Sequence, residues 1–434
     1  MKLHVSTASA VAVLLLVLAV PNRAAQGPPG GGADVPRVFD TNTRQRIRVV
    51  TVASGLVHPW SIAFLPDGRT MLVAERSGRL RIIRDGVLDP APIWNAPAEP
   101  VAPAAPTARG ATAPAPTGGT PSADRLHAVA VHPRFAQNRW VYVSHPKSGG
   151  RGNTLAVSRG RLEGSTLTDV HEIFVADAWE TSGNLAGRML FGPDATLYVT
   201  VGDRDRLCCT GTEDNSLRMK AQDLGNHVGK VLRITDEGGV PKDNPFVGRA
   251  GAKPEIFTYG HRNGYGLAFH PETGALWQAE IGPMGGDEIN ILLPGRNYGW
   301  PLVSMGRNYT GTLVSEDPWF RRGMENPRMF WVPSISPSSI SFYTGTRFPT
   351  WKGSLFVGAL NGKSLQRVSF NQPSQAERRE LLLTQLDIRI RDVVQGPCDW
   401  KAPGGPDGCL YVATEKVSAG ASPDGTILRI EPAE

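Results

Sequence analysis

Two arginines near the carboxyl-terminal end have a spacing that could bind an anion. Arg389 and Arg391 flank Ile390 in the run RIRDVVQGP. Side chains two residues apart in a strand point to the same side, so a strand here places both guanidiniums on one face. Such a pair can hold carboxylates through bidentate hydrogen bonds. A solvated strand face is the alternative, and the spacing alone leaves both open.

The four cysteines are the next residues with possible chemistry: Cys208, Cys209, Cys398 and Cys409. Their spacing matches no zinc pattern, and an even count suits disulfides in an exported chain. Cys398 and Cys409 bracket a Gly/Pro-rich insertion, so we expect them to bond with each other. Adjacent Cα atoms lie about 3.8 Å apart, below the usual disulfide range of about 4.4–6.8 Å. The pairing of Cys208 and Cys209 therefore stays open.

The amino-terminal region reads as a targeting signal followed by a lead-in. Lys2 precedes the apolar run Ala8 to Val20, and small residues follow it. The run is shorter than the ~20 residues that span a bilayer, which favours a signal peptide over residues 1–25 rather than an anchor. We therefore expect a periplasmic or secreted protein without stable membrane insertion. Residues 26–45 are expected to be a disordered lead-in.

The remainder, residues 46–434, repeats one strand–turn–strand theme. Copies begin at Phe64, His132, Phe191, Phe269, Phe348 and Gly405. A lone four-stranded sheet cannot bury both faces, whereas radial packing of several sheets can. The pattern predicts an all-β, six-bladed propeller of four-stranded antiparallel blades. The last strand, from Gly425, is expected to pair with the segment from Ile47 and close the ring.

Two further features exclude or qualify other classes. Residues 96–123 are low in complexity and rich in Pro, Ala, Thr and Gly, which predicts a surface loop outside the blades. The net charge is +6, yet Lys and Arg form no long run. A nucleic-acid-binding role would need a basic stripe, so we expect none.

Several long strings resemble the soluble PQQ-dependent aldose and sorbosone dehydrogenases. They are GLVHPWSIAFLPDG, GKVLRITDEGGVPKDNPF, GHRNGYGLAFHP, EIGPMGGDEINILLPGRNYGWP and RIRDVVQGP. The resemblance implies a quinoprotein that binds PQQ and calcium. It also implies hydride transfer from a sugar or related alcohol, with an exported cytochrome or quinone as electron acceptor.

The same resemblance assigns residues to this site. It gives cofactor binding to Arg389, Arg391 and Arg206, with Arg204 the less favoured neighbour of Arg206. PQQ carries three carboxylates, which arginine forks suit. The main-chain oxygens of Gly282 and Pro283 are expected to hold a calcium ion at the quinone. A second, structural calcium is implied at three residues whose alternative role is to shape a blade corner: Asp287, Glu288 and Tyr298.

Three departures from the family pattern fall near this expected pocket. Asn184 stands where the family has its general base, a histidine, and an amide has no useful basicity near neutral pH. Asn361 replaces a cofactor-contacting lysine, for which Lys363 could substitute. The third departure is Arg125 to Ala128, where the family reads Gly-Leu-Leu-Gly.

These departures leave several hypotheses open. The base could be His127, Asp203 or Asp205; each has a structural alternative, such as core packing or turn capping. The chain could instead be a non-catalytic or ligand-binding propeller of the same family. A calcium-dependent lactonase is a third reading, which the cofactor arginines argue against.

Overall fold

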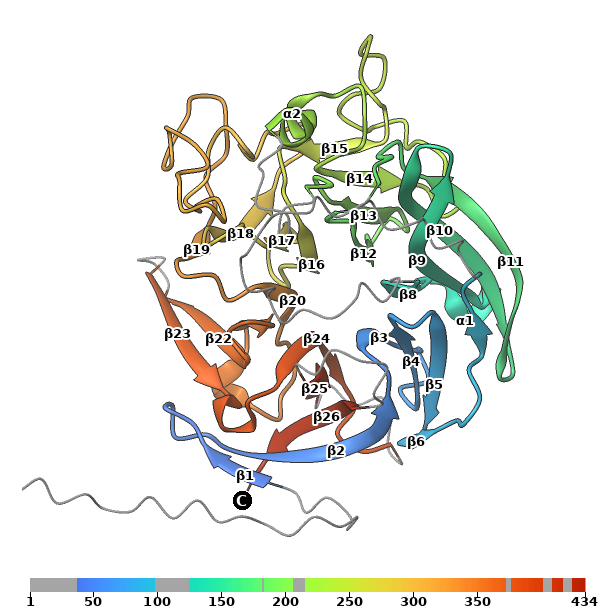
Figure 1. Ribbon diagram of the computed structural model, residues 1–434. Helices are drawn as coiled ribbons and strands as arrows, with labels where there is room; N and C mark the ends of the chain where they lie inside the picture. Colours follow the sequence, from blue (N-terminus) through green and yellow to red (C-terminus); the bar gives the residue numbers. More distant parts are fainter. Residues whose placement is uncertain are drawn as a thin grey trace, which may run out of the picture. The chain divides into compact units, whose positions relative to one another are not determined.

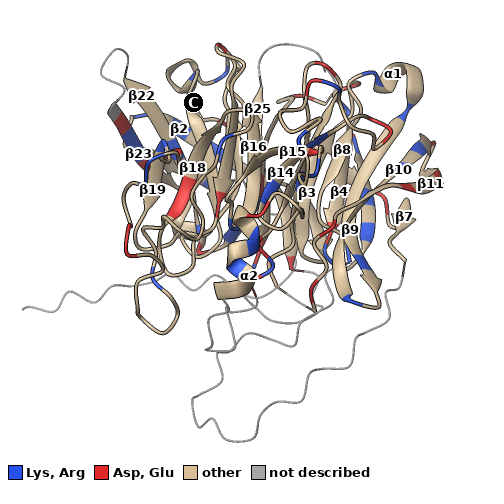
Figure 2. Cartoon of the chain, turned by 90° about the horizontal axis from the view of Figure 1, so that it is seen from above, with Lys and Arg blue, Asp and Glu red and all other residues tan. Residues whose placement is uncertain are grey.

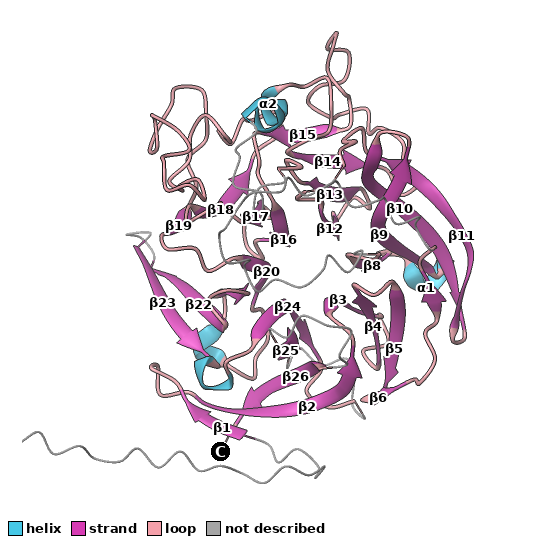
Figure 3. Ribbon diagram, viewed as in Figure 1, coloured by secondary structure: helices cyan, strands magenta, loops and turns pink. Residues whose placement is uncertain are grey.

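The computed structural model describes residues 37–97, 125–181, 183–205, 215–371, 376–400, 408–416 and 424–433. Within them the chain folds into six antiparallel sheets arranged in a ring (Figure 1). Strands dominate and helices are few (Figure 3). The predicted six-bladed propeller is confirmed. The expectations for residues 1–25, Arg206, Cys208, Cys209 and nearly all of residues 96–123 lie outside the described residues.

Each blade is numbered from its innermost strand. Blade 1 contains β3 (Pro59–Phe64), β4 (Thr70–Glu75), β5 (Arg79–Arg84), β6 (Val87–Leu88) and β7 (Trp94–Asn95). Blade 2 contains β8 (Val129–Val131), β9 (Trp140–Gly149), β10 (Gly152–Glu163) and β11 (Thr166–Val175). Blade 3 contains β12 (Ala186–Phe191), β13 (Leu197–Val201), β14 (Lys230–Ile234) and β15 (Ile256–Tyr259).

Blade 4 contains β16 (Gly264–Phe269), β17 (Leu276–Glu280), β18 (Asp287–Leu292) and β19 (Met329–Trp331). Blade 5 contains β20 (Pro337–Phe342), β21 (Leu355–Ala359), β22 (Ser364–Asn371) and β23 (Ala376–Leu382). Blade 6 contains β24 (Arg389–Gly396), β25 (Cys409–Glu415), β26 (Gly425–Pro432), β2 (Arg46–Leu56) and β1 (Arg37–Asp40). The helical segments are α1 (Phe135–Asn138), α2 (Asn215–Met219), η1 (Lys220–Gln222), η2 (Pro349–Trp351) and η3 (Thr384–Leu386).

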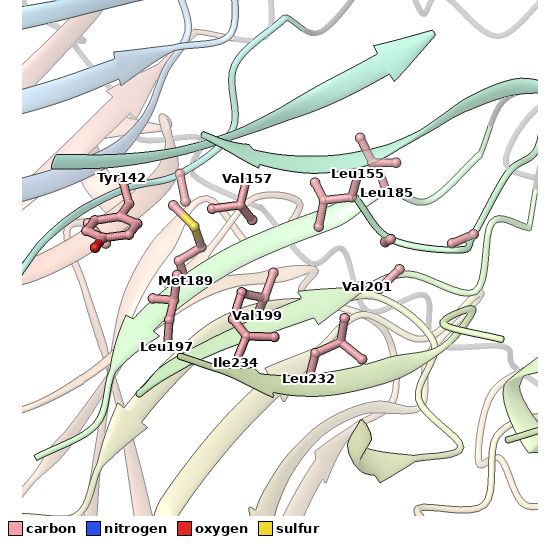
Figure 4. Close-up of a cluster of buried hydrophobic side chains, with 14 of the residues drawn as sticks. Tyr142, Leu155, Val157, Leu185, Met189, Leu197, Val199, Val201, Leu232 and Ile234 are labelled. Carbon is pink, nitrogen blue, oxygen red and sulfur yellow. The ribbon is translucent and has the colours of Figure 1, made fainter. Parts of the chain in front are cut away.

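The core lies between neighbouring blades. Figure 4 shows Val157 of blade 2 facing Met189 and Val199 of blade 3, within a larger buried cluster. Strand β13, the second strand of blade 3, is covered on both faces, so its run LYVTV is mostly apolar and is buried throughout. Each fully buried side chain of this size contributes about 1.5–3 kcal/mol. The alternation of apolar strands and turns thus accounts for the repeated blade.

The two ends of the propeller close the ring in blade 6. Strand β2 pairs antiparallel with β26, with Ile47 opposite Pro432 and Val49 opposite Ile430, which confirms the predicted closure. Strand β1 adds a fifth strand outside β2. It lies inside the stretch 26–45 that composition indicates as a lead-in. The run RVFD gains backbone hydrogen bonds by pairing with β2, which composition alone does not reveal.

Two smaller expectations can be compared with the structure. Cys398 and Cys409 form a disulfide with a Cα–Cα distance of 5.0 Å, as predicted. Figure 2 shows basic and acidic positions interspersed in the ring, consistent with scattered charge. No helix in the described ranges is long and apolar enough to cross a membrane.

Candidate active site

One end of the ring collects the residues that the sequence singles out. The six inner strands, β3, β8, β12, β16, β20 and β24, pack around the axis. In blades 4 and 6 the inner strand starts beside the end of the second strand, as shown by the pairs Gly264–Glu280 and Arg389–Glu415. We call this end of the ring the mouth. It brings together segments that lie hundreds of residues apart in the sequence.

Four blades place an acidic residue at the mouth, at or just after the end of the second strand. These residues, which we call the mouth acids, are Glu75, Asp203, Glu280 and Glu415, and all four are buried. A buried carboxylate needs a counter-charge or hydrogen bonds. The partners of each acid therefore indicate what its blade can do.

In blade 6 the mouth acid joins the predicted arginine pair. Arg391 Nη2 donates to Glu415 Oε1 at 2.6 Å, and Arg389 Nε lies 3.0 Å from the same oxygen. His58 Nδ1 lies 3.0 Å from Glu415 Oε2. Burial alone would raise the pKa of Glu415, but Arg391, His58 and Arg389 together hold it below its usual range. The expected common face for the two arginines is therefore present.

The arginine pair retains donors that could bind a ligand. Among the described residues, the Nε–H group of Arg391 makes no hydrogen bond, whereas Arg389 Nε faces Glu415. The pair shares one carboxylate, so it keeps a net positive charge. Burial and the neighbouring Arg391 lower the pKa of Arg389. A ligand with several carboxylates would satisfy both the charge and the unused donors.

In blade 3 the residue at the expected base position contacts a mouth acid. Asn184 Nδ2 donates to Asp203 Oδ1 at 2.9 Å, and Asp205 N donates to the same oxygen at 3.0 Å. Asp205 is itself paired with the buried Arg218, whose Nε donates to Oδ2 at 2.9 Å. Asp205 thus has an arginine as its ion-pair partner, whereas the side-chain partner of Asp203 is the neutral amide of Asn184.

Backbone hydrogen bonds join the segment at Asn184 to the segment that contains Asp203. Arg204 N donates to Asn184 O at 3.2 Å, and Asn184 N donates to Asp205 O at 3.3 Å. A Cβ on Gly202 would lie 2.2 Å from Asn184 O, so only glycine allows the close approach. Asn184 and Asp203 are therefore placed by the main chain rather than by flexible loops.

Blade 4 supplies a cation that our sequence analysis missed. Arg262 is buried, and its Nη1 donates to Ile281 O at 2.8 Å and to Gly282 O at 2.9 Å. Asn263 is also buried, and its Oδ1 makes no hydrogen bond within the described chain. Both lie in the string GHRNGYGLAFHP, directly before an inner strand, as Asn184 lies before β12. That shared position was the signal that could have identified them.

A second acidic pair lies beside Gly282. Glu280 and Glu288 are opposite one another in the β17–β18 ladder and are both buried. Burial raises the pKa of Glu280 to about 7, and burial plus the charge of Glu280 raises the pKa of Glu288 well above its ordinary value. Burial lowers the pKa of His261 to about 3, so this neighbour of Glu280 is neutral. The pair needs a shared proton or a cation.

A cavity of about 10 Å³ adjoins this acidic pair. Its walls include Glu280, Glu288, Tyr298, Gly282 and Gly286. That volume is about the size needed for one water molecule or one ion. The described residues contain no group of three or more His, Cys, Asp or Glu side chains placed to hold a metal. A cation in this cavity would rest on two carboxylates supplemented by oxygens of other kinds, which suits calcium.

Asp287 has a different set of partners. Its Oδ2 accepts hydrogen bonds from Ile335 N at 2.7 Å, Ser336 N at 2.8 Å and Ser334 Oγ at 2.8 Å. Its Oδ1 accepts one from Gly282 N at 2.9 Å. The carboxylate therefore joins the Gly282 loop to blade 5. Tyr298 lines the cavity, but its hydroxyl donates to Ile291 O at 2.6 Å.

The remaining predicted residues lie at the mouth with ordinary partners. Asn361 is exposed after β21, and Lys363 Nζ donates to Asp387 Oδ1 at 2.8 Å. His127 is buried, with Nδ1 2.8 Å from Ala186 O and its ring against Trp60. Neither Lys363 nor His127 contacts the mouth acids in the interactions described.

One buried arginine ties the blades together on the axis. Arg188 Nε donates to Tyr265 O at 2.6 Å, and Nη1 lies 3.2 Å from Asp392 Oδ1. Its guanidinium also lies 4.6 Å from the ring centre of Trp60. Its Nη2 donates to Ser338 O at 3.2 Å, so Arg188 connects its own blade to four others. Figure 1 shows the inner strands meeting around this axis.

Fold and mouth together define a six-bladed propeller whose axial site joins paired arginines to a set of buried acids. The chain belongs to the glucose/sorbosone dehydrogenase family, which it matches over residues 56–429. It is 36% identical to the aldose sugar dehydrogenase YliI of Escherichia coli over 391 residues, 89% of this chain and 93% of that one.

Two more distant relatives are also informative. Quinoprotein glucose dehydrogenase B of Acinetobacter calcoaceticus is 27% identical over 70% of this chain and 75% of its own. The PQQ-bound form of an aldose sugar dehydrogenase from Streptomyces coelicolor has a TM-score of 0.62 and 25% identity, covering 90% of this chain and 100% of that one.

Proposed function

We propose that this chain is a PQQ-dependent dehydrogenase that oxidises a sugar or related alcohol. The observation that carries the proposal is the pair Arg389 and Arg391, which share the single carboxylate of Glu415 and so leave a net positive charge at the mouth. The names of the E. coli and A. calcoaceticus relatives and the PQQ-bound relative support the same assignment. After the substrate is oxidised, the cofactor would pass its electrons to an acceptor, which we propose is an exported cytochrome or quinone.

The residues of the mouth would divide the work. Arg389 and Arg391 would hold cofactor carboxylates, with Arg206 and Lys363 as further proposed contacts. Arg262, fixed by the carbonyls of Ile281 and Gly282, would place positive charge where negative charge develops. When bound, the cofactor would supply a two-electron quinone acceptor for hydride.

Calcium would have two positions in this proposal. The oxygens of Gly282 and Pro283 would hold the ion that polarises the cofactor, since a carbonyl has a second lone pair beside the bond from Arg262. Glu288 would hold a second ion in the small cavity, with Glu280 in place of Asp287, because the Asp287 oxygens are already occupied. Binding there would also relieve the repulsion between the two glutamates.

A non-catalytic propeller of the same family is the second candidate. The observation in its favour is that Asn184 and Asn361 stand where the family has histidine and lysine. Such a protein would keep the arginine pair and bind the cofactor without turnover.

Reconstitution of the purified chain with PQQ and calcium separates the two candidates. We expect a bound-cofactor absorption spectrum and reduction of an artificial electron-acceptor dye on adding aldoses. Cofactor binding with no dye reduction for any sugar or alcohol tested would favour the non-catalytic candidate. Absence of both would overturn the dehydrogenase proposal. We also propose export to the periplasm or medium, which amino-terminal sequencing of the mature protein would test.

A further inference from the structure

The chain lacks a histidine at the expected base position, so another group must accept the substrate proton if the proposed function holds. Three side chains at the mouth are the strongest candidates: His127, Asp203 and Asp205. They differ in what already engages them. Asp205 is paired with the buried Arg218, whose Nε and Nη2 both lie 2.9 Å from Oδ2. His127 Nδ1 lies 2.8 Å from Ala186 O, next to the aromatic core.

Asp203 has a different environment. It is 0% exposed, and no cation of the described chain lies within ion-pair distance of it. Its Oδ1 accepts hydrogen bonds from Asn184 and from Asp205 N, whereas Oδ2, like Oδ1 of Asp205, has no hydrogen-bond partner among the described residues. A buried carboxylate oxygen without a partner is costly unless a ligand, water or proton occupies it.

We infer that Asp203 is the proton acceptor of this enzyme and that Asn184 orients both it and the substrate. Asn184 Nδ2 is committed to Asp203, which leaves the amide oxygen as the end that can accept a hydrogen bond from a hydroxyl. Asparagine is also shorter than histidine. Proton transfer requires that the space left beside Asn184 admit a water molecule or a hydroxyl to the buried Oδ2.

The step balances with the cofactor of the proposed function. The O–H bond of the substrate breaks and its proton passes to Asp203 Oδ2. The adjacent C–H bond breaks and the hydride carries both electrons to an ortho-quinone acceptor. The carbon–oxygen bond becomes a carbonyl. This inference rests on the proposed function, because a proton acceptor matters only if the site oxidises an alcohol.

The surroundings of Asp203 raise its pKa above that of an ordinary aspartate. Burial raises its pKa; Arg262 acts against the rise, and Asp205 adds to it. Two other charged groups interact with it, Arg204 on its own strand extension and Glu280 at the end of β17. A base with a pKa nearer the operating pH transfers protons more effectively than an ordinary aspartate.

The first test needs neither cofactor nor turnover. Infrared spectra of the cofactor-free chain are recorded across pH for wild type, Asp203→Asn and the matched control Asp205→Asn. We expect a protonated-carboxyl band that titrates above the range of an ordinary aspartate in wild type and Asp205→Asn. The contribution of one carboxyl to this band should be missing in Asp203→Asn, in which Glu280 and Glu288 still titrate. If the difference between wild type and Asp203→Asn contains no such titration, the inference fails.

The second test compares turnover of the PQQ- and calcium-loaded proteins. Asp203→Asn should lose about 10²–10⁴-fold in kcat with cofactor affinity unchanged, and added formate should restore part of the loss in Asp203→Ala. Asn184→His should move the acid limb of the pH profile toward the histidine value of about 6.5.

The outcomes of the second test separate the two proposals. Turnover in wild type that Asp203→Asn retains would overturn only the inference, as would turnover in Asn184→His but not in wild type. If neither wild type nor Asn184→His oxidises any sugar or alcohol, the proposed function fails and the inference fails with it.

Discussion

The buried acids on the two sides of the mouth have different partners. In blades 6 and 1 each mouth acid is matched by arginines: Glu415 by Arg389 and Arg391, and Glu75 by Arg79. In blades 3 and 4, Asp203 and Glu280 have no direct ion pair with a lysine or arginine among the described residues. Their hydrogen bonds come from amides, backbone groups and a neutral histidine.

This difference assigns separate tasks to the two sides. Two arginines that share one carboxylate keep a net positive charge and can bind an anion without changing protonation. Carboxyls without an ion pair can instead take up a proton or a cation, and burial shifts the pKa values of Asp203 and Glu280 upward. We expect blades 6 and 1 to bind the cofactor and blades 3 and 4 to carry the chemistry.

Removing the arginine pair should produce the largest effect on the binding side. Charge-assisted hydrogen bonds contribute about 1.5–3 kcal/mol each, so Arg389→Gln with Arg391→Gln should weaken PQQ binding by at least about 100-fold. The measurement is titration followed by absorbance. Because Glu415 would be left buried without its two arginines, the same change combined with Glu415→Gln keeps the fold testable.

A matched surface change sets the baseline for this prediction. Arg322→Ala removes an exposed arginine from the blade 4 excursion and should leave PQQ affinity within threefold. If the arginine-pair variant binds as tightly as Arg322→Ala, the cofactor is held elsewhere and the division between the two sides is wrong.

The sequence predicted the parts of this comparison that repeat or lie close together. The strand–turn theme gave six blades, the alternation at Arg389 and Arg391 gave a shared face, and the bracketing cysteines gave a disulfide. The counter-ions could not be predicted in the same way. His58 and Glu415 are 357 residues apart and meet only because the ring closes.

The buried acids show the same limit. Asp203 and Glu280 end strands in an ordinary way, and nothing local distinguishes them from turn-capping residues. Their environment depends on Asn184, Arg262 and Glu288, which reach them from other strands or from the next blade. From the sequence, Arg188 looks like an ordinary surface arginine in a strand. In the fold it binds polar groups of three other blades and packs against Trp60 of a fourth.

The disulfide should stabilise the fold without affecting either side of the mouth. It closes a short loop at the opposite end of β24 and β25, where the chain-entropy account allows up to about 3 kcal/mol. Cys398→Ser should lower the unfolding free energy by up to that amount in urea titrations, with PQQ affinity unchanged. A change in affinity comparable to that of the arginine-pair variant would show that the two ends of the blade are coupled.

Calcium should act on the chemistry side. Ligand at 100 times its Kd adds about 2.7 kcal/mol, so calcium should raise the melting temperature of the cofactor-free chain by on the order of 3 °C over a chelator control. Glu288→Gln should remove this shift. Asp287→Asn should lower the melting temperature through its lost hydrogen bonds but keep the response to calcium. If instead Asp287→Asn removes the calcium-dependent shift and Glu288→Gln keeps it, then Asp287 rather than Glu288 binds the ion.

The two sides should respond to pH with opposite signs, which is the smallest effect we predict. The pKa of Glu415 is lowered in the folded chain, so its ionised form contributes stability above its ordinary pKa, and that contribution is lost as the pH falls through the folded value. The pKa of Asp203 is raised, so its protonated form favours folding, and that contribution is lost as the pH rises from its ordinary value through the folded one.

Variants at these two positions can separate the opposing contributions. Urea unfolding between pH 3 and about pH 8 should show that Glu415→Gln loses most stability at the neutral end. The cost of Asp203→Asn relative to wild type should instead shrink as the pH rises, by about 1.4 kcal/mol for each unit by which its pKa is raised. Parallel curves for both variants would mean that neither acid is perturbed as its partners require, and the contrast between the two sides of the mouth would not hold.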